Sequence, residues 1–209
     1  MNIGPYTFEE FKQKVREFHG YPAPGVLLGG YMVERARSLL PPGTLFEAVV
    51  ETRKCLPDAV QLLTPLSVGN NWMKIVDLGR WALTLYDKHT GKGYRVFMDP
   101  VKLGAWPELK SWMLKEKAKK DQDSDRLVDE IRLAGATVCS VQCVTVSDGI
   151  RSKPHMGPVA LCPLCSEPYP VKHGTICRGC QGEAPYELDA PDVTAAQRPA
   201  LHAVTLPRL

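Results

Sequence analysis

Four of the seven cysteines stand in two closely spaced pairs near the C-terminus, within the segment LCPLCSEPYPVKHGTICRGC. Cys162 with Cys165, and Cys177 with Cys180, can each direct two thiolates at one ion through a tight turn. Four thiolates suit tetrahedral zinc and leave no open position for a substrate, so the spacing predicts a structural zinc site. The segment has few apolar side chains, and metal binding would supply its folding free energy, on the order of 10 kcal/mol.

Two other interpretations of these cysteines stay open. Two redox dithiols would share the spacing, although such dithiols normally open a helix after a strand, and neither pair follows that pattern. A rubredoxin-type iron centre would use the same four ligands. Cys139 and Cys143 lie four residues apart in a predicted strand, so their sulfur atoms stand about 13 Å apart and cannot share one ion. We expect both to be buried packing residues.

A second set of reactive side chains lies in the N-terminal half. His19 ends a predicted helix before a proline-rich turn, and Cys55 precedes a short predicted helix, with Asp58 one turn later. Taken singly, such a histidine is usually a cap or a packed residue, and such a cysteine a small buried hydrophobe. Taken together, His19 could act as a metal ligand or general base and Cys55 as a ligand or nucleophile. Asp58 would then be the carboxylate that orients them.

The elements that position these residues follow from apolar periodicity and turn signals. Helices are expected over residues 8–18, 26–40, 57–64, 107–117 and 124–133, and strands over 45–52, 72–77, 81–87, 94–99 and 136–146. Gly29 and Gly30 inside the second helix suggest that neighbouring elements pack closely there. The pattern predicts an α+β fold, with a mainly antiparallel sheet flanked by helices and followed by a small C-terminal zinc ribbon. The expected domains are 1–146, a linker over 147–158, the ribbon over 159–188 and a tail over 189–209.

Composition narrows the class of protein. The chain has 209 residues, 44% hydrophobic and 23% charged, as in soluble globular proteins. No apolar run is long enough to cross a bilayer, and the N-terminus is unlike a signal peptide, so a cytoplasmic protein without membrane association is expected. The net charge of +3 is too small to indicate a nucleic-acid surface.

Three stretches together resemble the E-subunit family of formylmethanofuran dehydrogenase, the FmdE family. They are FHGYPAPGVLLGGYMVERA, VVETRKCLPDAVQLLTPLSVGNNWMKIVDLGRWALTLYDKHTGKGYRV and the closing cysteine pairs. The resemblance implies a candidate metal site in which His19, Cys55, Asp58 and Asn70 occupy matching positions. The resemblance also reveals departures. Tyr21 replaces a second histidine, Ala23 replaces a cysteine, and Leu66 stands where the family has another cysteine.

Losing two thiolates removes most of the affinity of such a site for a soft metal ion. Three interpretations follow for the altered pocket of His19, Tyr21, Cys55, Asp58 and Asn70. It holds a second metal through His19 and Cys55, it is a metal-free pocket for a small molecule, or it is a structural relic.

The resemblance implies a metal-binding accessory protein linked to the one-carbon metabolism of molybdenum or tungsten enzymes, rather than the enzyme itself. Nothing in the sequence supplies a pterin site, and no residue is assigned a catalytic role. The alternative is a small-molecule-binding or thiol- or sulfur-transfer enzyme that uses the pocket of His19 and Cys55. The expected partners are a second copy of the chain, a larger oxidoreductase complex and a small-molecule ligand. The family and the expected exposure of Trp106 and Trp112 suggest the homodimer.

Overall fold

The structure is a computed structural model that describes residues 2–153 and 155–187. Its contacts divide the chain after Lys153 into two compact units. The helices are α1 (Phe8–His19), α2 (Pro24–Arg37), α3 (Leu56–Leu63), α4 (Pro107–Leu114), α5 (Ser124–Ala134) and α6 (Asp148–Arg151). The strands are β1 (Phe46–Val50), β2 (Met73–Ile75), β3 (Ala82–Asp87), β4 (Lys92–Met98), β5 (Cys139–Thr145), β6 (Val159–Leu161) and β7 (Pro168–Pro170).

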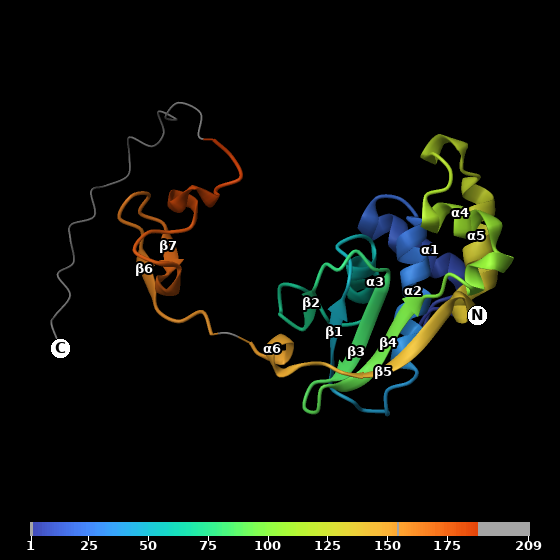
Figure 1. Ribbon diagram of the computed structural model, residues 1–209, viewed down its shortest axis with the longest axis horizontal. Coiled ribbons are helices and arrows are strands. Elements are labelled where there is room, and N and C mark those ends of the chain that lie inside the picture. Colours follow the sequence, from blue (N-terminus) through green and yellow to red (C-terminus); the bar gives the residue numbers. More distant parts are fainter. Residues whose placement is uncertain (1, 154, 188–209) are drawn as a thin grey trace. The chain divides into compact units, whose positions relative to one another are not determined.

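The first unit is built on a five-stranded sheet in the order β2-β1-β3-β4-β5 (Figure 1). The pairs β1 with β3, β3 with β4, and β4 with β5 are antiparallel, whereas β2 runs parallel to β1. In one register row Leu83 pairs with Val50 on one side and with Val96 on the other, and all three side chains are buried. The prediction of an α+β fold with a mainly antiparallel sheet is therefore confirmed.

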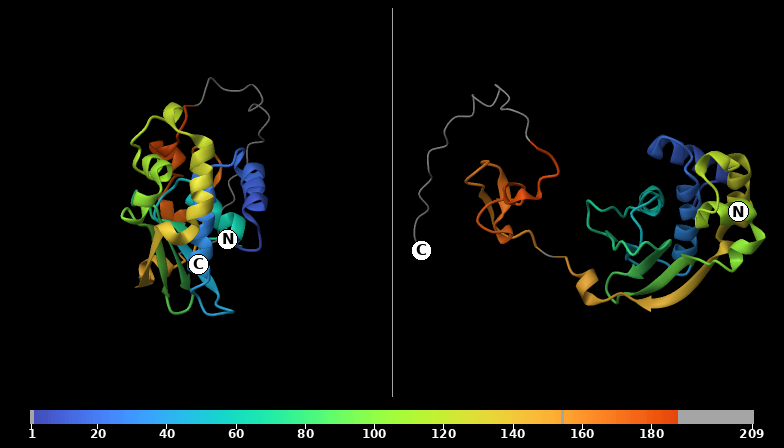
Figure 2. Two further views of the ribbon diagram at one scale, coloured as in Figure 1. Left: turned by 90° about the vertical axis from the view of Figure 1, so that its right-hand side faces the viewer. Right: turned by 45° about the horizontal axis from the view of Figure 1, so that its top comes forward.

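Helix α2 lies along one face of the sheet, with other helices packed against it (Figures 1 and 2). Its residues from Gly25 to Val33 are all buried, which its nearly continuous apolar sequence explains. A β-carbon on Gly29 would lie 2.7 Å from the Ala59 β-carbon, and one on Gly30 would lie 2.5 Å from the Phe11 ring. The two glycines thus let α3 and α1 approach, as the sequence predicts.

The segment 147–153, predicted as linker, is tied to the first unit. The guanidinium of Arg151 donates to the His89 carbonyl at 2.9 Å, and the Lys153 ammonium lies 2.7 Å from a carboxylate oxygen of Glu47. Because these cationic side chains bind strand β1 and the turn between β3 and β4, the first unit extends to Lys153. Residues 154 and 188, and the predicted tail over 189–209, lie outside the described residues.

Two expectations about burial are wrong. Cys139 is buried as expected, but Cys143 is exposed, because burial decreases along the edge strand β5 toward its C-terminal end. Trp106 and Trp112 are half-buried and pack against the hydrophobic core, so they do not form an exposed aromatic surface. In the described residues, no helix is long and apolar enough to cross a membrane.

Candidate metal centre and ligand cavity

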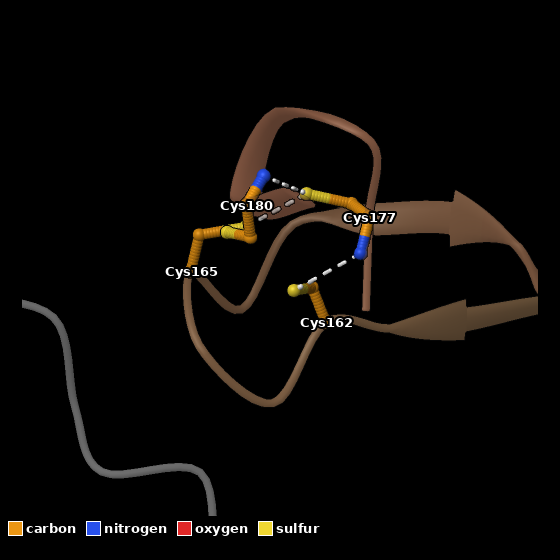
Figure 3. Close-up of side chains that lie close together, drawn as sticks. All are labelled: Cys162, Cys165, Cys177 and Cys180. Carbon is orange, nitrogen blue, oxygen red and sulfur yellow. Dashed lines mark hydrogen bonds between the residues drawn. The ribbon is translucent and has the colours of Figure 1, made fainter. Parts of the chain in front are cut away.

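The second unit brings the four C-terminal cysteines together. Cys162 and Cys165 lie in the turn between β6 and β7, and Cys177 and Cys180 lie where the chain enters a short helical segment, Gly179–Glu183 (Figure 3). Their sulfur atoms all lie within 4.8 Å of one another. This donor set fits a tetrahedral zinc ion and fills all four positions, so the site is structural.

Hydrogen bonds and close thiols shift the pKa values of this cluster in opposite directions. Backbone N–H groups, foremost that of Cys177 at 3.4 Å, lower the pKa of Cys162 to about 6. Hydrogen bonds of the Cys180 thiol with Cys177 and Cys165 raise the pKa of Cys180 to about 12. Zinc binding therefore requires deprotonation of the cluster, in which Cys162 ionises most readily and the raised pKa values of Cys165 and Cys180 oppose ionisation.

In the first unit, Cys55 has a strained backbone conformation. Its φ of 58° and ψ of −43° lie in the left-handed half of the map, and the N–H of Leu56 donates to the carbonyl of Lys54 at 2.6 Å. This combination is a γ-turn of the rare, strained type. Cys55 stands immediately before α3, and Pro57 lies in the first turn of that helix. Such conformations cost on the order of 1–3 kcal/mol and concentrate at functional sites.

Close packing against α2 holds the Cys55 side chain in place. A β-carbon on Gly25, in the first turn of α2, would lie 2.9 Å from the Cys55 sulfur and 2.9 Å from the Trp81 ring. Only a glycine leaves this space, so the start of α2 and the turn before α3 meet at Cys55.

His19 and Asp58 form a pair beside this turn. The His19 Nδ1 and the Asp58 Oδ2 are 2.7 Å apart, and both side chains are about one-quarter exposed, at 23% and 28%. The His19 ring also meets the Tyr21 ring edge-on, with centroids 5.1 Å apart. The Asp58 carboxylate orients the His19 ring through Nδ1.

A cavity of about 810 Å³ opens at Cys55 between the start of α2, α1, the end of α4 and α5. Tyr21 and Cys55 are the two predicted pocket residues in its lining. The lining residues are Lys12, Arg16, Tyr21, Pro22, Ala23, Pro24, Gly25, Cys55, Trp112, Lys115, Lys117, Lys119, Gln122, Ser124, Asp125, Leu127, Val128 and Asp129. Its volume is in the range of small-molecule sites in proteins.

Asn70 has another place in the structure. Its side-chain amide donates to the carbonyl of Pro65 at 2.8 Å, and its Oδ1 accepts from the backbone N–H groups of Ser67 and Trp72, both at 3.0 Å. These bonds organise the loop before β2. His19, Asp58 and Asn70 all lie outside the lining of the cavity at Cys55.

The residues of the first unit do not fit a second metal site of the family pattern. Ala23 and Leu66, at positions where the resemblance places cysteines, are only 1% and 2% exposed and offer no lone pair. In the described part of the first unit, no three His, Cys, Asp or Glu side chains are grouped so that they could hold a metal ion. His19 and Cys55 alone would leave most of the coordination shell to other molecules.

The environment of Cys55 favours the neutral thiol. Burial raises its pKa, the Asp58 carboxylate adds to this, and the ammonium groups of Lys115 and Lys54 act in the opposite direction. A thiolate nucleophile requires the reverse balance.

A buried carboxylate that no sequence pattern indicated fixes the end of the strand that leads to Cys55. Glu51 is buried and accepts two hydrogen bonds from the guanidinium of Arg95, at 2.6 and 2.9 Å. It also forms an ion pair with Arg80, whose Nε lies 2.7 Å from the Glu51 Oε2. The hydrogen bond from Arg95 is the main cause that lowers the Glu51 pKa. The alternation of apolar and polar residues did not indicate this ion-pair cluster, because Glu51 lies just past β1 and its partners come from distant segments.

Two family models match the sequence of this chain. Residues 18–146 match a family model described as "FmdE, Molybdenum formylmethanofuran dehydrogenase operon", and residues 153–187 match the "FmdE treble clef zinc finger". The second match agrees with the four-cysteine cluster and supports structural zinc.

A solved structure is similar over most of the chain. It is a tungsten formylmethanofuran dehydrogenase FmdE-like protein from Syntrophus aciditrophicus, 48% identical, with a TM-score of 0.83, and the match covers 89% of this chain and 98% of that one. A "Probable S-adenosyl-L-methionine-binding protein" from Archaeoglobus fulgidus is 36% identical over an alignment of 94 residues, and the match covers 41% of this chain but only 26% of that relative. By its family match and its zinc-binding unit, the chain belongs to the FmdE family and is a metal-binding, FmdE-like protein.

Proposed function

We propose that this protein is a non-catalytic accessory protein of one-carbon metabolism that binds a small molecule in the cavity at Cys55. The cavity itself carries the proposal, because a strained turn and a glycine contact hold Cys55 at a space of about 810 Å³. The zinc finger serves as a structural and partner-docking module. The family name supports the link to molybdenum or tungsten enzymes.

A ligand pocket accounts for the altered residues better than a second metal does. Replacing a thiolate by Ala23 removes a soft ligand and leaves an apolar residue in the cavity lining, which suits an organic molecule. Leu66 removes a second soft ligand and lies buried outside that lining. The raised pKa of Cys55 likewise speaks against sulfur-transfer chemistry, which would need a thiolate.

The proposed partners follow from the family name and the sequence. We expect a homodimer and association with a larger oxidoreductase in the cytoplasm, without nucleic-acid or membrane binding. The half-buried Trp106 and Trp112 give the dimer no support. Copurification with a larger oxidoreductase, and light scattering for the dimer, would test these expectations.

The relative from Archaeoglobus fulgidus suggests S-adenosylmethionine as one ligand to test. This ligand carries two positive groups and one carboxylate at neutral pH. The cavity lining has five basic and two acidic side chains, which is unfavourable for such a charge.

Metal analysis combined with thermal unfolding tests the proposal. Protein purified without added metal should contain about one zinc per chain, in line with one four-thiolate site. Cys55→Ser should leave the zinc content unchanged, whereas Cys177→Ser should abolish it. A second metal that disappears in Cys55→Ser would overturn the metal-free pocket.

A small-molecule library, with S-adenosylmethionine included, should yield compounds that raise the melting temperature of the wild-type protein without being turned over. Compounds that act at the proposed site should lose this effect when Ala23→Leu fills the cavity. Ligands that stabilise both proteins equally would place binding elsewhere and contradict the proposal.

A further inference from the structure

We propose that the cavity at Cys55 takes a small organic anion, whose apolar part rests on the cavity floor and whose negative charges face a ring of basic side chains. This inference rests on the proposed ligand-binding role and adds the chemical class of the ligand. Three separate features of the cavity support it.

The first feature is the charge at the cavity mouth, here called the basic rim. It consists of Lys12 and Arg16 from α1 together with three lysines that follow α4, namely Lys115, Lys117 and Lys119. Asp125 and Asp129 are the acidic residues of the lining. Two segments a hundred residues apart in the sequence therefore supply like charges to one opening, which concentrates positive potential there.

Much of this positive charge is not neutralised by the protein. Among the described residues, neither Arg16 nor Lys119 makes an ion pair, and Lys115 lies 4.9 Å from the centre of the Trp112 ring. Of the acids, Asp129 is already paired with Arg132 at 3.1 Å. An anion would therefore meet basic groups that have few competing partners.

Lys12 and Lys117 are the two rim residues with acidic neighbours. Lys12 lies 3.6 Å from Glu9, and Lys117 pairs with Glu108. These acids lie outside the cavity lining, but each partly neutralises the lysine that it pairs with. The two lysines therefore contribute less to the positive potential in the cavity than Arg16 and Lys119 do.

The second feature is the apolar floor. Ala23, Gly25 and Leu127 are buried, and Cys55 contributes a thiol whose raised pKa keeps it uncharged at neutral pH. An inorganic ion would leave this floor without a partner. A ligand with an apolar body and charged groups at one end fits both parts of the cavity.

The third feature is the N-terminus of α2. The cap position is Ala23, whose side chain makes no capping hydrogen bond, and Pro24 has no N–H to donate. Ala23, Pro24 and Gly25 all line the cavity, so the positive end of a 14-residue helix is directed toward it. The helix dipole adds to the positive potential that the basic rim produces in the cavity, and it favours an anionic ligand over a cationic one.

The ligand class that satisfies all three features is a phosphorylated or polycarboxylated molecule with a small apolar body. Anilinonaphthalene sulfonate and the uncharged phenylnaphthylamine form a matched pair of fluorescent probes for this class. They share an aromatic body and differ in the negative charge. Citrate and pyrophosphate then serve as competitors at constant ionic strength.

The test uses the full-length protein and a double variant, Arg16→Gln with Lys119→Gln. The control is Lys14→Gln with Lys92→Gln, which makes the same change of net charge at exposed or partly exposed positions outside the cavity. Loss of two rim charges should weaken binding of the anionic probe about tenfold at low salt, and the control should change it less than about twofold. Citrate or pyrophosphate should displace the probe from the wild-type protein, and the two competitors distinguish carboxylate from phosphate preference.

The outcomes separate this inference from the proposed function. If the uncharged probe binds as tightly as the anionic one and neither double variant matters, the cavity binds ligands but the anion class is wrong. If neither probe binds, and library compounds also fail to stabilise the protein, the ligand-binding role is wrong as well. An equal loss in both double variants would show a general charge effect and would also overturn the inference.

Discussion

A β-carbon at position 25 would lie 2.9 Å from the sulfur of Cys55, so the absent side chain of Gly25 is what allows the two residues to meet. The contact joins the first turn of α2 to the γ-turn before α3. It also fixes the apolar end of the cavity, because both residues belong to its lining. Packing and strain at this one contact therefore determine the shape of the proposed site.

Gly25→Ala should destabilise the protein by about 1–3 kcal/mol, because the added methyl group overpacks a filled space. In an uncrowded helix the same change would be stabilising by up to about 1 kcal/mol. The sign of the change in urea unfolding free energy thus reports directly on the contact. Gly104→Ala is the control, since nothing lies within 4 Å of a β-carbon there, and it should change stability by less than about 0.5 kcal/mol.

A double-mutant cycle assigns this cost to Cys55. Cys55→Gly removes the sulfur and the β-carbon that crowd position 25, and glycine also tolerates the positive φ of 58°. Combined with Cys55→Gly, the alanine at position 25 should lose about 1 kcal/mol or more of its penalty. Strict additivity of the two changes would show that the crowding arises elsewhere.

The zinc centre could be predicted from the sequence because its signal is local. Two CxxC pairs with short spacing specify a donor set whatever the surrounding fold is, and the four sulfur atoms are found together. The strands and helices of the first unit were likewise predictable from periodicity, as for α5 and β3. Their ends depend on caps and turns, so α2 and α4 end three residues before the predicted boundaries.

The cavity could not be predicted in the same way, because its parts are distant in sequence. Asn70 was assigned to the pocket from a motif, whereas its hydrogen bonds to Pro65, Ser67 and Trp72 give it a role within its own loop. The basic rim could not be predicted from the sequence, because Arg16 and Lys119 each resemble ordinary solvent-exposed charged residues. Only the three-dimensional fold brings α1 and the segment after α4 to one opening.

Thiol labelling should distinguish the three cysteines of the first unit. With zinc bound, brief alkylation at neutral pH should modify the exposed Cys143 first, Cys55 more slowly, and Cys139 hardly at all, because burial raises the Cys139 pKa to about 12. Since the Cys55 pKa is raised, its labelling rate should continue to increase as pH rises above the usual cysteine pKa of about 8.5. Peptide mass spectrometry measures each site, with Cys143→Ser as the control for assignment. Cys55 labelled faster than Cys143 at neutral pH would contradict the neutral-thiol environment and favour the enzymatic alternative.

Zinc removal should affect the two units differently. A chelator should unfold the four-cysteine unit, because the metal links its two turns, while the first unit keeps its own core and its melting temperature. Apparent zinc affinity should fall as pH decreases, since protons compete for Cys180, whose pKa is raised to about 12, and then for Cys162 below about pH 6. Competition with a colorimetric zinc indicator across pH measures the affinity, and Cys177→Ser is the control that lacks the site. Zinc binding without proton release would contradict this account.

Glu51→Gln should destabilise the first unit by about 3 kcal/mol at neutral pH, because it leaves the partly buried Arg95 without its carboxylate partner. The pKa of Glu51 is lowered in the folded protein, mainly by its hydrogen bond from Arg95, so the carboxylate stabilises the fold above the usual glutamate pKa of about 4.3. That contribution is lost as pH falls through the lower, folded-state pKa. The difference in unfolding free energy between wild type and Glu51→Gln should therefore shrink as the pH falls below about 4.

Glu9→Gln, at an exposed ion pair with Lys12, is the control and should change stability by less than about 1 kcal/mol at any pH. A difference that stays constant down to acid pH would mean that Glu51 stabilises the protein through its packing rather than its charge, and that the strand leading to Cys55 is not held by this carboxylate.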